Sequence, residues 1–199
     1  MIEGVKIWAQ RLSYVGELGY ELYVDINHAK KIYELLIEKG KDFNLSNCGM
    51  HAMDIMRMES GFLHWGHDIS PEENQYQAGL NFAISYKKNI NFVGKEALLK
   101  MKEKNQNKKF AMFILKNNKP GEPLLLHDEP IYSDGKIIGR TTSGNYSFNY
   151  NKNMAFGYIN SELSKEELAK KEYVIEVEKN KYSAFMILKP LNDQNIKTV

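Results

Sequence analysis

The sequence predicts an α+β protein in which a mixed α/β region at residues 1–104 is followed by a small antiparallel β-barrel at residues 108–199. Two observations carry this prediction. Strand-like and helix-like apolar patterns alternate in the first region, whereas the second consists mainly of short strand-like segments separated by turn-prone residues. Between them, the polar run 102–109 lacks any apolar periodicity. We therefore place a domain boundary in that run.

The first element is a strand, a turn and a second strand. Apolar alternation through Lys6–Ser13 and renewed alternation at Tyr20–Val24 predict the two strands. Gly16 and Gly19 fall in the turn, where glycine allows backbone conformations that are closed to other residues.

Glu21 and Tyr23 are expected to share one face of the second strand, because side chains alternate along a strand. A carboxylate can accept two N–H bonds from an aminopyrimidine edge, and tyrosine rings can flank a flat heterocycle. The segment therefore suits a pterin. The alternative is an ordinary hairpin with an exposed glutamate and packed tyrosines.

Helical spacing predicts three helices in the first region, at His28–Lys39, Met50–Glu59 and Gly94–Lys104. Asn27 is expected to cap the first helix and Gly61 to end the second. In the third, Ala97, Leu98 and Met101 are expected to face inward. A short strand is expected at Phe82–Ser85.

Six short strands are predicted for the barrel: Phe110–Leu115, Glu129–Ser133, Lys136–Ser143, Met154–Ile159, Tyr173–Lys179 and Tyr182–Leu188. Ser164 and Glu167 have the spacing of a capping box. The run Thr141-Thr-Ser-Gly144 presents hydroxyls in series, but no histidine–acid pair at a recognisable spacing would activate a nucleophile there. A barrel turn is predicted for it.

Several motifs resemble one family in the same order. They are Ser13-Tyr-Val-Gly-Glu-Leu-Gly-Tyr-Glu21, Met56-Arg-Met-Glu-Ser-Gly-Phe-Leu-His-Trp-Gly-His-Asp68, Gln77-Ala-Gly-Leu80, Phe92-Val-Gly-Lys-Glu-Ala-Leu98, Gly139-Arg-Thr-Thr-Ser-Gly-Asn-Tyr-Ser147 and Met154-Ala-Phe-Gly-Tyr-Ile159. Together they look like the tetrahydrofolate-binding aminomethyltransferase fold, which glycine-cleavage T-protein shares with the folate half of dimethylglycine and sarcosine dehydrogenases. The residues at His64–Asp68 and Thr141–Gly144 resemble the dehydrogenases more than T-protein. Met53 stands where T-protein typically has an arginine, so any salt bridge from that arginine is absent.

The resemblance implies that residues 1–104 are the C-terminal portion of a folate-binding domain and that 108–199 are its C-terminal barrel. It implies tetrahydrofolate binding through Tyr14, Glu21, Leu22, Tyr23 and Trp65. For Trp65, core packing is the alternative. The family's catalytic aspartate precedes the first motif, so no catalytic residue is assigned in this chain.

The implied reaction is capture of an oxidised N-methyl carbon as 5,10-methylenetetrahydrofolate. FAD would be bound only by a domain or subunit outside this chain, which contains no Gly-x-Gly-x-x-Gly run. We expect the chain to be the C-terminal portion of a larger enzyme, either an isolated fragment or one piece of a split protein, and to be inactive alone. A methylated amine is the expected substrate. The alternatives are a stand-alone T-type aminomethyltransferase and a noncatalytic folate-binding module.

The composition is ordinary for a globular protein, with 43% hydrophobic and 26% charged residues. A net charge of +2 with scattered lysines gives no indication of nucleic-acid binding. The sequence shows no membrane span or signal segment, and its single cysteine cannot form an internal disulfide. A cytoplasmic location is therefore expected. Because the resemblance implies that the folate-binding domain lacks its beginning here, we expect exposed apolar surface around its sheet and therefore self-association or edge pairing.

Two further groups are assigned structural roles. His64, His67 and Asp68 include an i,i+3 histidine pair without another cysteine or histidine cluster, so hydrogen bonding is predicted in preference to metal binding. Arg57 and Glu59 lie where a helix ends. A structural ion pair with the glycine-containing turn is predicted for them, and ligand contact is the alternative.

Overall fold

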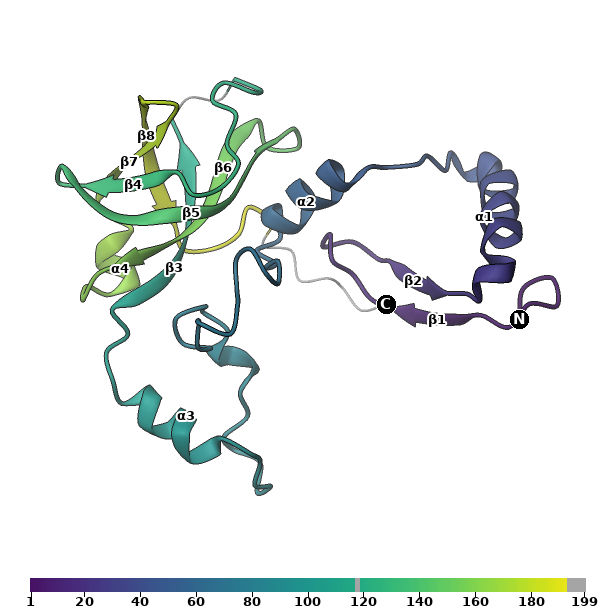
Figure 1. Cartoon of the computed structure of the whole chain (residues 1–199), viewed down its shortest axis with the longest axis horizontal. Coiled ribbons are helices and arrows are strands. Elements are labelled where there is room, and N and C mark those ends of the chain that lie inside the picture. The colour runs from purple at the N-terminus through teal and green to yellow at the C-terminus, as the bar shows by residue number, and fades with distance from the viewer. Residues whose placement is uncertain (117–118, 193–199) are drawn as a thin grey trace. The chain divides into compact units, whose positions relative to one another are not determined.

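The computed structural model describes residues 1–116 and 119–192, so residues 193–199 of the predicted barrel domain lie outside the described residues. The described chain forms two compact units: residues 1–62 together with Asn192, and Leu63–Leu191. A mixed α/β architecture with a closed antiparallel barrel is present, which confirms the predicted fold class (Figure 1).

In the first unit, strands β1 (Trp8–Arg11) and β2 (Tyr20–Tyr23) form an antiparallel hairpin. Gly16 in the turn has φ +79°, as predicted, and a Cβ there would also collide with the Ser60 hydroxyl. Gly19 serves another purpose. The backbone of Gly19 passes close to that of Leu12, so a Cβ at Gly19 would lie 2.9 Å from the carbonyl oxygen of Leu12.

Helix α1 (Ile26–Gly40) begins earlier than predicted because Asp25, not Asn27, is its N-cap. The Asp25 carboxylate accepts a 2.9 Å hydrogen bond from the backbone N–H of Asn27, which satisfies a helix-terminal donor. A 3-10 turn, η1 (Lys41–Phe43), follows. Helix α2 (Met50–Glu59) has the predicted bounds and ends before Gly61, whose φ is +74°.

The second unit begins with a long loop region that leads to η2 (Asn81–Ala83) and helix α3 (Lys95–Lys102). The predicted strand at Phe82–Ser85 is wrong, because local hydrogen bonds such as Ala83 N–H to Leu80 O close a 3-10 turn there. In α3 only Leu98 of the three residues expected to face inward is partly buried.

The barrel consists of β3 (Lys108–Leu115), β4 (Pro130–Ser133), β5 (Lys136–Ser147), β6 (Lys152–Asn160), β7 (Glu172–Val177) and β8 (Asn180–Ile187). Hydrogen-bonded neighbours run β3-β6-β5-β4-β7-β8, and β8 pairs with β3 to close the barrel (Figure 1). All six predicted strands are therefore confirmed. Helix α4 (Lys165–Leu168) carries the predicted Ser164–Glu167 capping box.

Alternating inward residues of the strands form the barrel core, in which Phe113 and Tyr173 meet edge to face with ring centroids 5.1 Å apart. The run Thr141–Gly144 is not the predicted turn. It lies inside β5, where the register with β6 shifts between Thr141 and Ser143. Such a bulge re-aims the side chains beside it.

Candidate functional site

The β1–β2 hairpin brings Glu21 and Tyr23 together on one face, as their alternation predicts. The Tyr23 hydroxyl donates a 2.7 Å hydrogen bond to Glu21 Oε2. This bond, together with the charge of Glu21, raises the pKa of Tyr23 above its ordinary value. Both side chains are exposed, and Glu21 Oε1 makes no hydrogen bond within the described part of the chain. That oxygen is free to accept from a ligand.

The opposite strand supports this face. Trp8 lies directly across from Tyr23 in the register, and their ring centroids are 5.0 Å apart with a 30° angle between the rings. Leu22 points to the other face of the hairpin because it falls between Glu21 and Tyr23. The hairpin therefore groups two of the predicted site residues and separates Leu22 from them.

Tyr14 lies in the turn region and is partly buried. Its ring stacks on Phe62, with centroids 6.3 Å apart and an interplanar angle of 11°. The turn is also fastened to the end of α2, because the Ser60 hydroxyl donates to the carbonyl oxygen of Val15 at 3.3 Å. Tyr14 is thus a packed side chain at the base of the hairpin turn.

Arg57 has a structural role within this first unit. Its side chain is 1% exposed, and its guanidinium bonds the Asp54 carboxylate at 2.8 Å and the Phe62 carbonyl oxygen at 3.1 Å. The fork-shaped group therefore braces the end of α2 through a carboxylate on its own helix.

Trp65 belongs to the second unit, where it is 66% exposed at the tip of the His64–Ile69 loop. The alternative of core packing is therefore wrong. The loop is closed by backbone bonds from Asp68 N–H to His64 O and from Gly66 N–H to Ile69 O, both at 2.8 Å. Gly66 has φ +88°, a conformation that favours glycine. The tight loop presents an aromatic face to its surroundings.

Asp68 anchors this loop to the barrel. Its carboxylate is fully buried and accepts hydrogen bonds from the hydroxyls of Thr142 and Ser143 on β5, the latter at 2.8 Å. Its other oxygen accepts from the backbone N–H of His64 at 2.9 Å. The sequence pattern indicates no partner for Thr142 or Ser143. The serial hydroxyls were the visible signal, but nothing local connects them to an aspartate 74 and 75 residues away.

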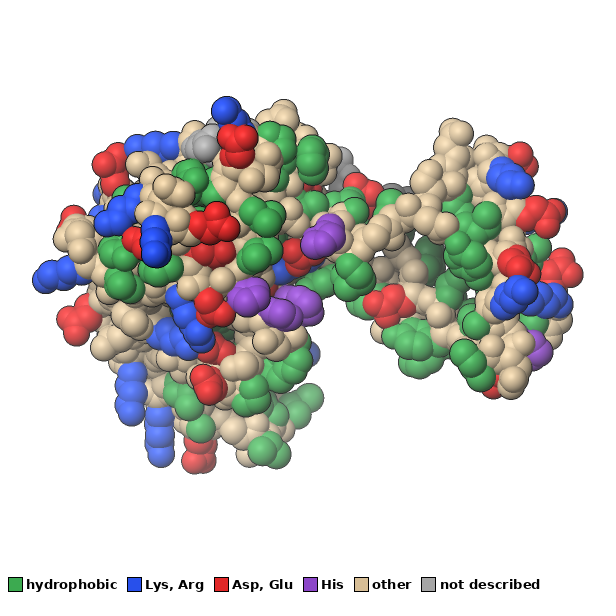
Figure 2. All heavy atoms as spheres, turned by 45° about the horizontal axis from the view of Figure 1, so that its top comes forward, with side chains coloured by type: hydrophobic (Ala, Val, Ile, Leu, Met, Phe, Trp, Pro, Cys, Tyr) green, Lys and Arg blue, Asp and Glu red, His purple; other side chains and the backbone are tan. Residues whose placement is uncertain are grey.

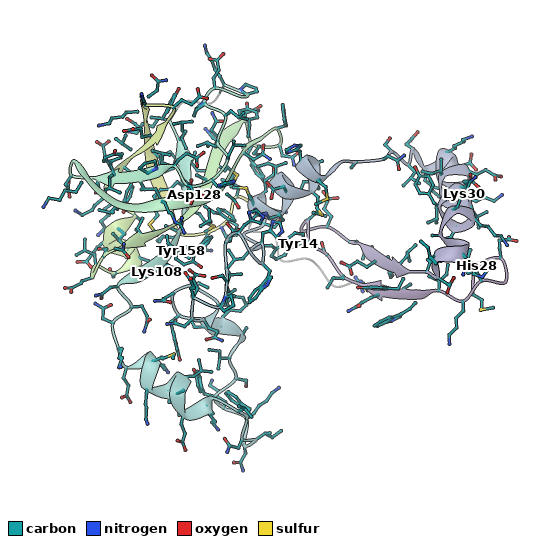
Figure 3. All side chains as sticks on the ribbon, in the orientation of Figure 1. Tyr14, His28, Lys30, Lys108, Asp128 and Tyr158 are labelled. Atoms are coloured by element: carbon teal, nitrogen blue, oxygen red, sulfur yellow. The ribbon has the colours of Figure 1, made fainter. Side chains whose placement is uncertain are left out.

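A second carboxylate, Glu73, fastens the loop region to the neighbouring strand β3. It pairs with the Lys108 ammonium and accepts from the Ser70 hydroxyl at 2.7 Å. Burial alone would raise the pKa of Glu73, but these hydrogen bonds outweigh burial and lower it. Lys108 also lies 4.8 Å from the ring centroid of Tyr158 on β6, and the two labelled side chains are neighbours in Figure 3.

Tyr158, which lies beside Glu73 and Lys108, was not predicted from the sequence. It is buried, and its hydroxyl has no hydrogen-bond partner among the described residues. Burial, followed by the negative charges of Glu73 and Asp68, raises the pKa of this hydroxyl. Tyr158 therefore remains a neutral phenol beside two carboxylates.

The three histidine rings of this unit lie in a row and are tilted relative to one another. The rings of His64 and His67 lie 4.5 Å apart, and His67 lies 6.3 Å from His127. Figure 2 shows histidine side chains close together on the surface, beside acidic and basic groups. Within residues 1–116 and 119–192, no group of three or more histidine, cysteine or acidic side chains is arranged to hold a metal ion. Nor does any helix in these ranges have the length and apolar character needed to cross a membrane.

Comparisons with known proteins identify the family to which this chain belongs. Residues 1–88 match the GCVT N-terminal domain, and residues 108–193 match the glycine cleavage T-protein C-terminal barrel domain. The six-stranded barrel is thus of the T-protein type. The chain belongs to the glycine cleavage T-protein family of folate-binding aminomethyltransferase domains.

Among its relatives, the chain is 42% identical to 4-methylaminobutanoate oxidase (formaldehyde-forming) from Paenarthrobacter nicotinovorans over 70% of this chain and 16% of that protein. It is 34% identical to mitochondrial dimethylglycine dehydrogenase from Rattus norvegicus over 96% of this chain and 22% of that protein. The chain therefore spans less than a quarter of either protein's length. These relatives are enzymes, so the chain belongs to an enzyme family.

The solved structure of glycine cleavage system aminomethyltransferase T from Bartonella henselae matches with a TM-score of 0.79. The match covers 94% of this chain and 50% of that one, at 23% sequence identity. This likeness supports the fold.

Proposed function

We propose that this chain is the tetrahydrofolate-binding portion of an FAD-dependent N-methyl amine dehydrogenase of the dimethylglycine or sarcosine type. The observation that carries the proposal is the exposed Glu21 carboxylate, which Tyr23 holds by a 2.7 Å hydrogen bond while Oε1 stays open. The likeness to dimethylglycine dehydrogenase over 96% of the chain supports the dehydrogenase branch.

The side chains of this chain would act by binding and orientation. Glu21 would accept hydrogen bonds from the amino and ring N–H groups of the pterin, and Tyr23 would fix the carboxylate and flank the ring. Tyr14, packed on Phe62, would hold the hairpin turn. Trp65 would offer an aromatic face. Tetrahydrofolate, when bound, supplies the amine that captures the one-carbon unit as 5,10-methylenetetrahydrofolate.

The remaining parts of the assignment are proposals on the same basis. Residues 1–104 would form the C-terminal portion of the folate-binding domain and 108–199 the barrel domain, in keeping with the two family matches. Oxidation of the methylated amine would take place in a flavin domain or subunit separate from this chain, and the catalytic aspartate would also lie there or in the rest of the folate domain. The chain alone would be inactive. The enzyme would be located in the cytoplasm.

The test is Glu21→Gln in the intact enzyme, with tetrahydrofolate affinity measured by calorimetry. An amide nitrogen would face ligand donors, so we expect a loss of about 1.5–3 kcal/mol, or roughly one to two decades in affinity. Amine-dependent flavin reduction should persist while free formaldehyde rises. Glu34→Gln is the matched control, because Glu34 is an exposed glutamate on α1 whose only ion pair among the described residues is with Lys30. Unchanged folate affinity in a folded Glu21→Gln enzyme would refute the assignment.

A stand-alone T-type aminomethyltransferase is the second candidate, favoured by the family models, which are both named for the glycine cleavage T-protein. It would use the same folate site but receive its carbon from a lipoylated carrier protein. Folate-dependent release of ammonia from an aminomethylated carrier, without flavin reduction by a methylated amine, would identify this function.

A further inference from the structure

The side chain of Lys165, the first residue of α4, approaches a glycine turn of the second compact unit. Gly79 in this turn has φ +74°, and a Cβ there would lie only 3.3 Å from Lys165 Nζ. The turn is held to β3, because the backbone N–H of Phe110 donates to the carbonyl oxygen of Gln77 at 2.8 Å. The amine of Lys165 therefore lies against a fixed backbone, at a position where the glycine leaves room for it.

A second lysine, Lys109 on β3, is tied to the segment that leads into α4. Its ammonium donates hydrogen bonds to the carbonyl oxygens of Gln106 and Ser161, the latter at 2.6 Å. Burial lowers the pKa of Lys109, and the charge of Glu162 opposes that effect. Because its two acceptors are neutral carbonyl groups, they fix the ammonium in place without cancelling its charge.

The amine of Lys165 has no such partners. Within residues 1–116 and 119–192 it makes no hydrogen bond and no ion pair, although the side chain is partly buried. Burial lowers the pKa of Lys165, the charge of Glu166 opposes this effect, and the charge of Lys109 adds to it. An amine that is desolvated and lies near another cation is neutral more often at pH 7, so its lone pair is available to an electrophile.

We propose that Lys165 is a nucleophilic amine that captures small aldehydes reversibly as a Schiff base. The lone pair of Nζ attacks the carbonyl carbon, and the π electrons of the carbonyl group move to its oxygen, which takes a proton to give a carbinolamine. Loss of water then forms the C=N bond, and addition of water reverses the reaction. Neither an oxidant nor a reductant is consumed.

The glycine turn restricts the size of the aldehyde, because the backbone of Gly79 occupies one side of the amine. Formaldehyde is the smallest aldehyde, and the proposed function would release it whenever folate fails to capture the oxidised carbon. The inference goes beyond that function, since the reactivity of Lys165 requires neither folate nor flavin.

Competitive methylation of the full 199-residue chain tests this reactivity. Limiting formaldehyde at neutral pH forms Schiff bases, sodium cyanoborohydride donates hydride to them, and peptide mass spectrometry locates the resulting N-methyl groups. We expect Lys165 to be methylated roughly three- to tenfold faster than Lys170, an exposed lysine of the same unit, because a lowered pKa leaves more of the amine neutral. Equal rates at the two lysines would overturn the proposal.

Two substitutions should change the rate at Lys165 in opposite directions. Glu166→Gln removes the charge that opposes deprotonation, so methylation should become faster. Lys109→Gln removes the neighbouring positive charge, so methylation should become slower, whereas Lys109→Arg keeps the charge and should retain the native rate. Glu178→Gln, which alters an exposed glutamate between β7 and β8, is the matched control for Glu166→Gln and should change nothing.

The response of Lys165 to both charges decides the proposal. A rate that is the same in Glu166→Gln, Lys109→Gln and the native chain would overturn it. If Lys109→Gln does not fold, as judged by circular dichroism, Glu166→Gln decides, because Glu166 is exposed and its replacement leaves the packing intact. None of these measurements uses folate, so unchanged folate affinity in Glu21→Gln would reject the proposed function and leave this inference standing.

Discussion

At the scale of the residue, Glu73 makes stability depend on pH. Burial acts to raise its pKa, but hydrogen bonds from Lys108 and Ser70 hold it below the ordinary value. A carboxyl group whose pKa is lower in the folded state stabilises the fold above its unfolded pKa, about 4.3 for glutamate. That contribution is lost as the pH falls through the folded pKa.

We therefore expect Glu73→Gln to flatten the acid side of the stability profile. The thermal midpoint of the native chain should fall more steeply between about pH 5 and pH 3 than that of the variant. Thermal unfolding followed by circular dichroism across this range is the measurement. Glu72→Gln, which changes an exposed neighbour, should keep the native slope. Parallel profiles for Glu73→Gln and the native chain would show that Glu73 contributes nothing to this dependence.

The local contact within the hairpin could be predicted from the sequence, but the long-range contacts of Asp68 could not. Glu21 and Tyr23 could be paired in advance because strand alternation alone places them on one face. The bonds from Asp68 to Thr142 and Ser143 depend on how the chain folds back across the barrel and on a bulge that the strand pattern does not reveal. Residue identity showed which groups could bond, but not which ones meet.

At the scale of the element, the N-cap of α1 is the clearest correction. Asp25 accepts from the Asn27 backbone N–H, while Asn27 itself lies inside the first turn. Asp25→Ala should destabilise α1 by about 0.5–2 kcal/mol, because it leaves a helix-terminal donor unpaired. Asn27→Ala should cost less, since its backbone N–H still reaches Asp25. Hydrogen exchange of the α1 amides measures both, and a larger effect for Asn27→Ala would restore the sequence-based prediction.

Elements whose pattern is strong were predicted, and elements governed by their surroundings were not. In the barrel region, short strand-like segments are separated by turn-prone residues, so the six strands could be predicted from the sequence. Phe82–Ser85 is apolar enough for a strand, yet in the described structure it has no strand to pair with and closes a local 3-10 turn. A strand requires a neighbour, which a sequence window does not contain.

At the scale of the whole molecule, the chain divides at different positions by compactness and by family match. The compact units separate after Phe62, whereas the family models leave residues 89–107 between them. The polar segment proposed as the boundary also carries specific bonds: Asn105 donates to Glu162 O and Ser161 N–H donates to Asn107 O. Matching a family domain and forming a compact unit are therefore separate properties in this chain.

The hairpin predicts how the whole chain behaves in solution. Every residue of β1 and β2 is exposed, including Trp8, Tyr20 and Leu22, and Figure 2 shows apolar side chains at the surface. Among the described residues these strands pair only with each other, and an isolated two-stranded sheet is marginal in water.

Burying this surface and its open edges against a second copy would stabilise the hairpin, so we expect self-association that grows with concentration. Sedimentation velocity from low to high micromolar concentration measures it. Trp8→Glu should shift the chain toward the monomer, because a charge would be buried in the contact. Phe148→Glu alters a similarly exposed aromatic residue of the other compact unit and should leave association unchanged. A native chain that stays strictly monomeric throughout, or an equal effect of both variants, would show that the hairpin is not the contact surface.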